Sequence, residues 1–232
     1  MSNDINTITD VANYLEYSTS TVHRLLQTMK QTNWVIQDEN NHKYYLGPMI
    51  TQLSSNRIAA HKYLIMHSLR EMVRLSDITE ESINLSVMAQ MHNTLLHEIS
   101  SPHNLRITEE SKKMGQQYNG ATAKVLLSQF NDEELRTILK RVKIIPATKK
   151  TVTDKRLLIK QLEEIRLKGY CLTSGERIPG ALCISAPIKQ YICPASLSVV
   201  GPEKRLRPRA REVIAEVQAS TGRISKDITG VF

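Results

Sequence analysis

Hydroxyl, amide and guanidinium side chains are concentrated between residues 18 and 31. Residues 18–21 all carry hydroxyls, and Arg24, Gln27 and Gln31 then recur at helical spacing. Hydroxyls and free N–H groups at a helix start suit phosphate oxygens, while Arg and Gln can bond base edges in a major groove. These types and spacings predict contacts with double-stranded DNA through Ser18, Thr19, Ser20, Thr21, His23, Arg24, Gln27 and Lys43.

Two short amphipathic helices must position these side chains. Apolar residues recur at i, i+3, i+4 and i+7 in two successive segments, so each helix has one face to bury. We expect Thr9 to cap the first helix and Ser18 the second, with residues 16–18 as the turn. The spacing predicts a helix-turn-helix, although an ordinary helical hairpin has the same periodicity. The apolar positions are Ile8, Val11, Ala12 and Leu15, then Val22, Leu25, Leu26 and Met29.

Two strands are predicted directly downstream. Residues 34–36 and 43–46 are rich in aromatic and β-branched side chains and flank the polar turn 38–41. A hairpin after a helix-turn-helix is the wing of a winged helix, which we assign to residues 1–48.

Several motifs resemble those of the IclR family of bacterial transcription regulators. Residues 20–26 (STVHRLL), 37–38 (QD) and 45–48 (YLGP) are similar to the DNA-binding end of that family. Residues 175–188 (GERIPGALCISAPI) look like its effector-domain signature, and residues 115–128 and 197–202 also follow its pattern. The resemblance covers essentially the whole chain and implies a DNA-binding transcriptional regulator controlled by a small-molecule effector.

The remaining chain is long enough for a second domain with its own core. We expect a linker helix over 49–62 and an α+β domain over 63–232, because predicted strands lie at both ends and predicted helices lie between them. The resemblance implies a GAF-like fold for this domain. Strands are expected at 83–89, 94–99 (after a turn at 92–93), 170–173, 183–186 and 195–200, the first of them half-buried, and helices at 61–75, 121–130, 132–142, 154–168 and 208–220.

The effector site is expected at one end of this second domain. Free N–H groups at the helix start near Gly120, Ala121 and Thr122 would suit a carboxylate. The resemblance implies a pocket lined by Thr173, Cys183 and Ser198, with Ile107 and Ala181 as apolar wall, and a small organic or aromatic acid as effector. Taken singly, such hydroxyls are more often structural groups in strands, and such a thiol is more often a small buried apolar group, than a ligand contact.

The N-terminal region departs from the family pattern. The family places a complete helix before the two found here, whereas only about six residues precede Ile8. A winged helix lacking its first helix would leave Ile8, Leu15, Leu25 or Trp34 partly uncovered. Glu16 also occupies a turn position where the family has Gly and where positive φ is expected. The alternative function is therefore an effector-sensing or oligomerisation module with a degenerate DNA-binding domain.

Charge and composition bear on where DNA could bind and on where in the cell the protein acts. The net charge is +8, yet residues 1–50 hold three basic and five acidic side chains, so charge alone does not locate a DNA site. The basic runs 136–160 and 204–211 suit solvated surfaces, with phosphate contact as the alternative. No apolar run could span a membrane and no signal peptide is evident, which predicts a cytoplasmic protein.

We predict no enzymatic activity, cofactor or metal. Cys171, Cys183 and Cys193 show no paired spacing, and His92, His97 and His103 show no metal-ligand spacing. A homodimer or homotetramer is expected, because a symmetric regulator binds a pseudo-palindromic operator.

Overall fold

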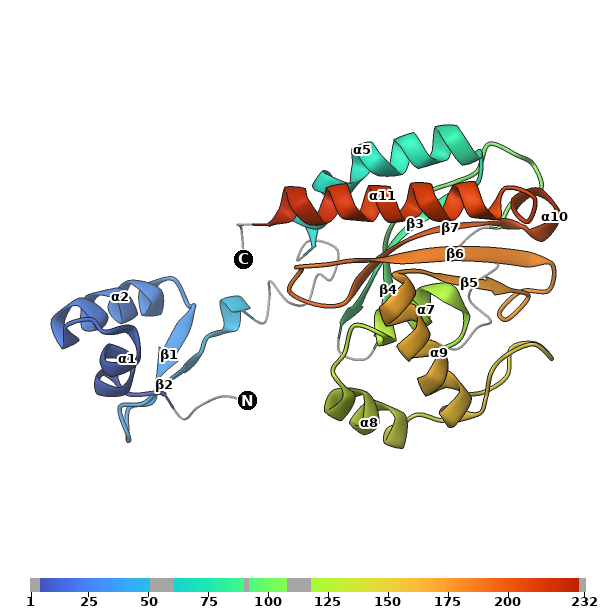
Figure 1. Ribbon diagram of the computed structural model, residues 1–232. Helices are drawn as coiled ribbons and strands as arrows, with labels where there is room; N and C mark the ends of the chain where they lie inside the picture. Colours follow the sequence, from blue (N-terminus) through green and yellow to red (C-terminus); the bar gives the residue numbers. More distant parts are fainter. Residues whose placement is uncertain (1–4, 51–60, 90–91, 108–117, 230–232) are drawn as a thin grey trace. The chain divides into compact units, whose positions relative to one another are not determined.

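The computed structural model describes residues 5–50, 61–89, 92–107 and 118–229. The chain forms two compact units that divide between Lys62 and Tyr63 (Figure 1). Most of the predicted linker helix over 49–62 lies outside the described residues.

The first unit contains two helices followed by a hairpin. Helices α1 (Ile8–Leu15) and α2 (Thr19–Gln31) are joined by a turn over 16–18, as the sequence predicts. Strands β1 (Val35–Gln37) and β2 (Tyr44–Leu46) pair antiparallel and form the wing. The small core contains Ala12, Val22, Leu26, Val35 and Tyr44.

The cap of α1 differs from the prediction. Thr7, not Thr9, is the N-cap: its hydroxyl accepts a hydrogen bond from the Asp10 N–H at 3.1 Å, and the Asp10 carboxylate accepts one from the Thr7 N–H at 3.3 Å. This reciprocal pair satisfies two otherwise unpaired donors, which Thr9 cannot do because Ala12 lies three residues after it. The prediction for Ser18 is confirmed, since it caps α2.

Part of the apolar surface of the first unit is uncovered, as predicted. Leu15, Leu25 and Trp34 are 46%, 50% and 40% exposed, and Ile8 is half-buried. Glu16 adopts φ 56°, the left-handed conformation expected at this turn. Each helix therefore buries a narrower face than its four apolar positions suggest.

The second unit is built on a five-stranded antiparallel sheet, so the α+β prediction is confirmed. The strand order is β4-β3-β7-β6-β5. Strand β4 already includes His92 and Asn93, which were predicted as a turn. The strands are β3 (Ser82–Ala89), β4 (His92–Ile99), β5 (Cys171–Ser174), β6 (Ala181–Ile188) and β7 (Ala195–Pro202).

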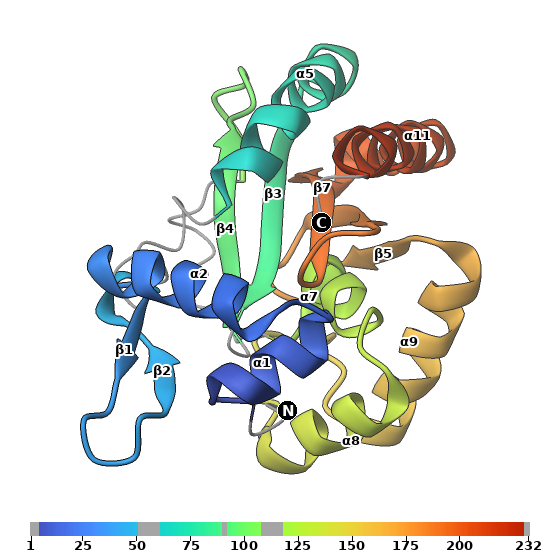
Figure 2. The same cartoon turned by 90° about the vertical axis from the view of Figure 1, so that its left-hand side faces the viewer.

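Helices cover both faces of this sheet (Figures 1 and 2). One face packs against α5 (Lys62–Thr79) and α11 (Ala210–Ile228), which follows the short α10 (Glu203–Leu206). The other packs against α7 (Gly120–Leu127), α8 (Asp132–Arg141) and α9 (Lys155–Lys168). Strand β3 is therefore buried on both faces rather than half-buried.

Helix ends in this unit follow local chemistry. Asn131 and Glu134 form the predicted capping box of α8. Asp154 caps α9, which ends at Gly169 with φ 72°. The last helix continues eight residues past the predicted Ser220, because Ile224 and Ile228 extend its buried stripe. No helix in the described ranges is long and apolar enough to cross a membrane.

Candidate DNA-binding surface and effector pocket

The predicted DNA-contacting residues lie on the surface of the first unit. Ser18, Thr19, Ser20 and Thr21 form the exposed start of α2, and His23 and Arg24 are exposed in its next turn. Gln27 on α2 and Lys43, which precedes β2, are half-buried. Six of the eight side chains are therefore exposed and can contact a macromolecule such as DNA.

Hydrogen bonds organise the hydroxyls at the start of α2. The Ser18 hydroxyl accepts from the Thr21 N–H at 3.2 Å and lies 2.9 Å and 2.8 Å from the hydroxyls of Ser20 and Thr21. Ser18 is thus committed mainly to capping the helix. The neighbouring hydroxyls and N–H groups form a concentrated donor surface of the kind that phosphate oxygens accept from.

Arg24 is the cation at the centre of this surface. Its guanidinium makes no ion pair or hydrogen bond with any residue in the described part of the chain, whereas Lys30 donates to Gln37 at 3.3 Å. One turn along, the Gln27 amide lies 3.5 Å from the His23 ring. Arg24 is therefore available for bidentate hydrogen bonding to a base or phosphate.

The second unit contains a cavity of about 230 Å³ at the start of α7. Strands β3, β4, β5 and β6 supply seven of its sixteen lining residues, and residues 175–178 close one side. The lining residues are Asn84, Ser86, Asn93, Leu95, Ile107, Gly120, Ala121, Thr122, Thr173, Gly175, Glu176, Arg177, Ile178, Ala181, Cys183 and Val200.

Seven of the eight predicted effector residues line this cavity. They are Ile107, Gly120, Ala121, Thr122, Thr173, Ala181 and Cys183. The eighth, Ser198, is fully buried outside the lining and lies 2.9 Å from the Thr122 hydroxyl. Ser198 therefore orients a lining residue rather than facing the cavity.

Two of the three predicted N–H groups at the start of α7, those of Gly120 and Ala121, already have partners. The Gly120 N–H donates to the Glu176 carboxylate at 3.3 Å, and the Ala121 N–H donates to the Thr173 hydroxyl at 3.1 Å. The other Glu176 oxygen accepts from the buried Lys124 ammonium at 2.6 Å. The predicted position for a ligand carboxylate is thus occupied by the chain's own Glu176.

Sequence reasoning missed the polar residues on β3 and the charged pair after β5. Asn84 and Ser86 alternate with apolar residues, and this alternation could have placed them on one face. Arg177 lies within the motif noted over 175–188. Its stem packs so closely on α7 that a Cβ at Gly120, which has φ 82°, would come within 2.9 Å of its Cδ.

Burial makes two of the three cysteines poor nucleophiles. Burial raises the pKa of Cys171 to about 12 and that of Cys193 to about 11, which disfavours the thiolates needed for nucleophilic attack. Cys183 Sγ lies 3.7 Å from the Thr122 hydroxyl. Within the described ranges, no three His, Cys, Asp or Glu side chains cluster as metal ligands would.

A winged helix-turn-helix joined to an α+β unit with a ligand-sized cavity defines a class of protein, the effector-responsive DNA-binding regulators. Family comparison gives the specific assignment. Residues 57–226 match the bacterial transcriptional regulator IclR C-terminal family, and residues 4–39 match the IclR helix-turn-helix domain. The chain belongs to the IclR family of DNA-binding transcriptional regulators.

Curated relatives and solved structures agree with this assignment. The HTH-type transcriptional regulator KdgR of Escherichia coli K12 is 30% identical over 221 residues, which cover 94% of this chain and 84% of KdgR. The crystal structure of the E. coli KdgR C-terminal domain is 27% identical, with a TM-score of 0.61, and covers 71% of this chain and 98% of that one.

A more distant structure shows the same fold over both units. An IclR homologue from Microbacterium hydrocarbonoxydans, solved in complex with 4-hydroxybenzoate, is 21% identical with a TM-score of 0.61. The match covers 96% of this chain and 91% of that one.

Proposed function

We propose that this regulator binds a small organic acid in the cavity of its second unit and that binding changes its affinity for a pseudo-palindromic operator. A homodimer or homotetramer would present two α2 helices to the two half-sites. Such a protein acts in the bacterial cytoplasm as a regulator and not as an enzyme. The single observation that carries the acid assignment is Arg177 in the wall of the cavity.

Two charged side chains line the described cavity, Glu176 and Arg177. Glu176 is 11% exposed and its charge is compensated by Lys124, which is 2% exposed. Arg177 therefore supplies the positively charged side chain of the cavity wall. Because a guanidinium binds a carboxylate through two parallel hydrogen bonds, an acid is favoured over a neutral or cationic ligand. A relative solved with a bound aromatic acid supports this proposal.

The ligand test uses isothermal titration calorimetry of the whole chain against a panel of small aliphatic and aromatic acids and their amides. We expect at least one acid to bind, its amide to bind at least about tenfold more weakly, and Arg177→Gln to remove this preference. Lys150→Gln is the control, because Lys150 is an exposed cation near Gly175 but outside the lining. Equal binding of acids and amides would exclude the role of Arg177.

The DNA test is a mobility-shift experiment on the region upstream of the gene, at ~150 mM salt with excess non-specific competitor, because phosphate-only binding weakens steeply with salt. We expect a discrete complex that Arg24→Ala weakens by about 1–3 kcal/mol with loss of sequence preference. Lys226→Ala, at an exposed position on α11 outside both basic runs, is the control. Retained affinity and selectivity in Arg24→Ala would remove Arg24 from base recognition.

The alternative is an effector-sensing or oligomerisation module with a degenerate DNA-binding domain. The exposed apolar side chains Leu15, Leu25 and Trp34 favour this alternative, because an incompletely covered core is expected to hold α2 less rigidly. Acid binding without any competitor-resistant DNA complex would support it. A discrete complex that responds to the acid would exclude it.

A further inference from the structure

Residues 136–160 of the second unit carry the whole net charge of the chain. They contain nine basic side chains and one acidic side chain, so their net charge of +8 equals that of the full sequence. The other residues carry equal numbers of basic and acidic side chains. All nine cations are exposed. We call residues 136–160 the basic segment; its cations repel one another unless an external anion compensates them.

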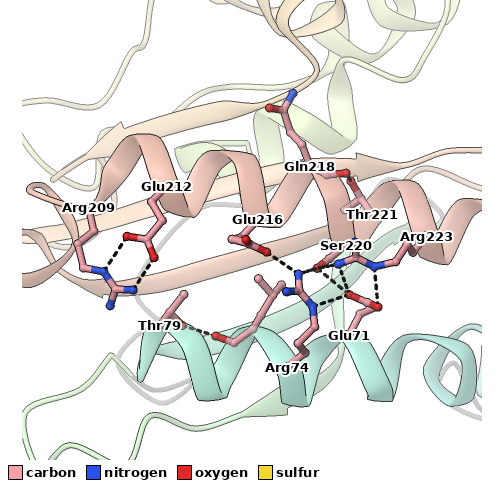
Figure 3. Close-up of polar contacts among 11 residues, drawn as sticks. Glu71, Arg74, Thr79, Arg209, Glu212, Glu216, Gln218, Ser220, Thr221 and Arg223 are labelled. Atoms are coloured by element: carbon pink, nitrogen blue, oxygen red, sulfur yellow. Dashed lines mark hydrogen bonds and ion pairs between the residues drawn. The ribbon is translucent and has the colours of Figure 1, made fainter.

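Cations elsewhere in the second unit are paired with carboxylates of the same chain. Figure 3 shows two such pairs, Arg209 with Glu212 at 2.8 Å and Arg223 with Glu71 at 2.7 Å. Of the ion pairs between described residues, none involves the basic segment. Its one carboxylate, Asp154, accepts hydrogen bonds from the first backbone N–H groups of α9 at 2.7 Å and 3.0 Å.

The structure separates this segment from the other basic run in the sequence, residues 204–211. Three of the five basic side chains in that run form ion pairs, and their charges are therefore compensated within the chain. The pairs are Arg205 with Glu81, Arg207 with Glu203 and Arg209 with Glu212. The uncompensated cations are thus concentrated in the basic segment.

Helices α8 and α9 bring six of the nine cations together. Both helices cover the same face of the sheet, and the end of α8 lies beside the start of α9 (Figures 1 and 2). The Lys155 ammonium donates to a backbone carbonyl of α8 at this point. Arg136 and Lys140 are one turn apart on α8, and Arg156 and Lys160 are one turn apart on α9, so each helix directs two of these cations to one exposed side.

The loop between α8 and α9 holds the other three cations on an ordered backbone. The Thr151 hydroxyl accepts from the N–H groups of Ala147 and Thr148, each at 3.0 Å, and donates to the Glu176 carbonyl at 2.7 Å. The Thr148 hydroxyl donates to the Gly175 carbonyl at 2.7 Å. A partner therefore binds a surface that is already folded, which lowers the entropic cost of binding. The three cations are Lys143, Lys149 and Lys150.

The composition of the basic segment fits the phosphate backbone of a DNA duplex. Residues 136–160 contain no aromatic side chain on which an unpaired base could stack, and no Asn or Gln that would read a base edge. Lys and Arg alone provide contacts to phosphate that are independent of sequence. Because the first unit of the same chain binds DNA, duplex phosphates are present near the second unit at high local concentration.

We propose that the basic segment is a second DNA-contact surface, on the unit that holds the effector cavity, and that it binds the phosphate backbone of double-stranded DNA without reading its sequence. It adds affinity that depends on salt and lengthens the stretch of DNA that the protein covers.

The salt dependence of DNA binding by the full-length chain tests this surface. Fluorescence anisotropy on a random-sequence duplex of about 40 base pairs, at roughly 50 to 300 mM salt, gives the slope of log affinity against log salt. The triple variant Arg136→Gln, Lys140→Gln and Lys143→Gln should make this slope shallower by about 2 to 3, because each lost phosphate contact removes about 0.9. Its affinity at 100 mM salt should fall at least about tenfold.

A matched triple variant removes the same charge from other parts of the second unit. Arg70→Gln, Lys189→Gln and Lys226→Gln change exposed cations that lie outside both basic runs. This variant should change the slope by less than about 0.5, because it removes no phosphate contact. Equal effects of the two triple variants would mean that only net charge matters, and would overturn the proposal.

Lysine acetylation of the unsubstituted chain provides a readout that does not depend on the folding of a variant. A saturating amount of the random-sequence duplex should slow acetylation of Lys140, Lys143 and Lys160 at least about threefold, as followed by mass spectrometry, because bound phosphates cover their ammonium groups. Acetylation of Lys189 and Lys226 should not change. Unchanged rates at the three lysines of the basic segment would overturn the proposal.

An anionic membrane is the competing polyanionic surface. Vesicles of phosphatidylcholine with about 30% phosphatidylserine should not bind the chain in a sedimentation assay at ~150 mM salt. Vesicle binding that the first triple variant abolishes would reassign the basic segment to lipid and overturn the proposal. The duplex has a random sequence and no acid is present, so these results are separate from operator recognition and from acid binding.

Discussion

Replacement of Glu71 by Gln should destabilise the second unit at neutral pH. Glu71 is 6% exposed, links α5 to α11 through Arg223 and Ser220, and also accepts a hydrogen bond from Arg74 on its own helix. Hydrogen bonding to Arg223 is the main cause that lowers the pKa of Glu71 from 4.5 to about 2. Desolvation acts in the opposite direction, and the hydrogen bonds from Ser220 and Arg74 add to the lowering. Glutamine keeps the shape and loses the charge.

The expected loss of folding stability follows from the lowered pKa of Glu71. A lowering from 4.5 to about 2 corresponds to about 3 kcal/mol of preferential stabilisation of the carboxylate in the folded state, at about 1.4 kcal/mol per pKa unit. Because both arginines are partly exposed, solvent screening reduces this to about 2 kcal/mol. In a unit of this size the melting temperature should fall by roughly 4–8 °C.

The stabilisation that Glu71 provides should depend on pH in a defined direction. Because the folded-state pKa is lowered, the stabilisation is complete above the unfolded pKa of 4.5 and is lost as the pH falls toward about 2. The stability difference between the original chain and Glu71→Gln should therefore be largest at pH 6–8 and should shrink steadily below about pH 4.5.

The assay is urea denaturation followed by far-UV circular dichroism at several pH values. The single tryptophan, Trp34, lies in the first unit, so its fluorescence provides an internal control that should not change. Glu164→Gln is the matched variant, because Glu164 forms an exposed pair with Lys168 on α9 and its loss should have no measurable effect. Equal stability of Glu71→Gln and the original chain at pH 7, or a difference that persists unchanged at pH 3, would refute the reasoning.

Three further substitutions test other features. Glu16→Gly should stabilise the first unit by about 0.5–1 kcal/mol, because Glu16 has φ 56° and glycine adopts that conformation without strain; a lower urea midpoint of Trp34 fluorescence would contradict this. Gly47→Ala should unfold the wing, because a Cβ there would lie 2.2 Å from the Asn33 carbonyl oxygen. An unchanged urea transition of Trp34 fluorescence would argue against this clash. Lys124→Met should destabilise the second unit by about 3 kcal/mol, because it leaves the partly buried Glu176 carboxylate without its cation. Urea denaturation followed by circular dichroism should show this loss. Unchanged stability would mean that water solvates the Glu176 carboxylate.

The sequence determined the features that depend on local chemistry. Helical periodicity located α1 and α2, and the Asn131–Glu134 pair identified the start of α8, because these signals act over three or four residues. Seven of the eight predicted effector residues line the cavity; motif resemblance identified four of them, and the predicted helix start at 120–122 identified the other three. The uncovered state of Leu15, Leu25 and Trp34 also followed from comparing this sequence with the family pattern.

Only the tertiary structure decided which donors have partners and which faces are covered. Glu176 lies fifty-six residues from Gly120, yet its carboxylate accepts the Gly120 N–H, so the predicted carboxylate position is already filled. Strand β3 has the alternation of a half-buried strand but is covered on both faces by helices from distant parts of the chain. On α5, the tertiary structure likewise decides that Met66 and Val73 are exposed, because the sheet packs against the opposite side of the helix. Periodicity shows that a face is apolar, whereas long-range packing determines what covers it.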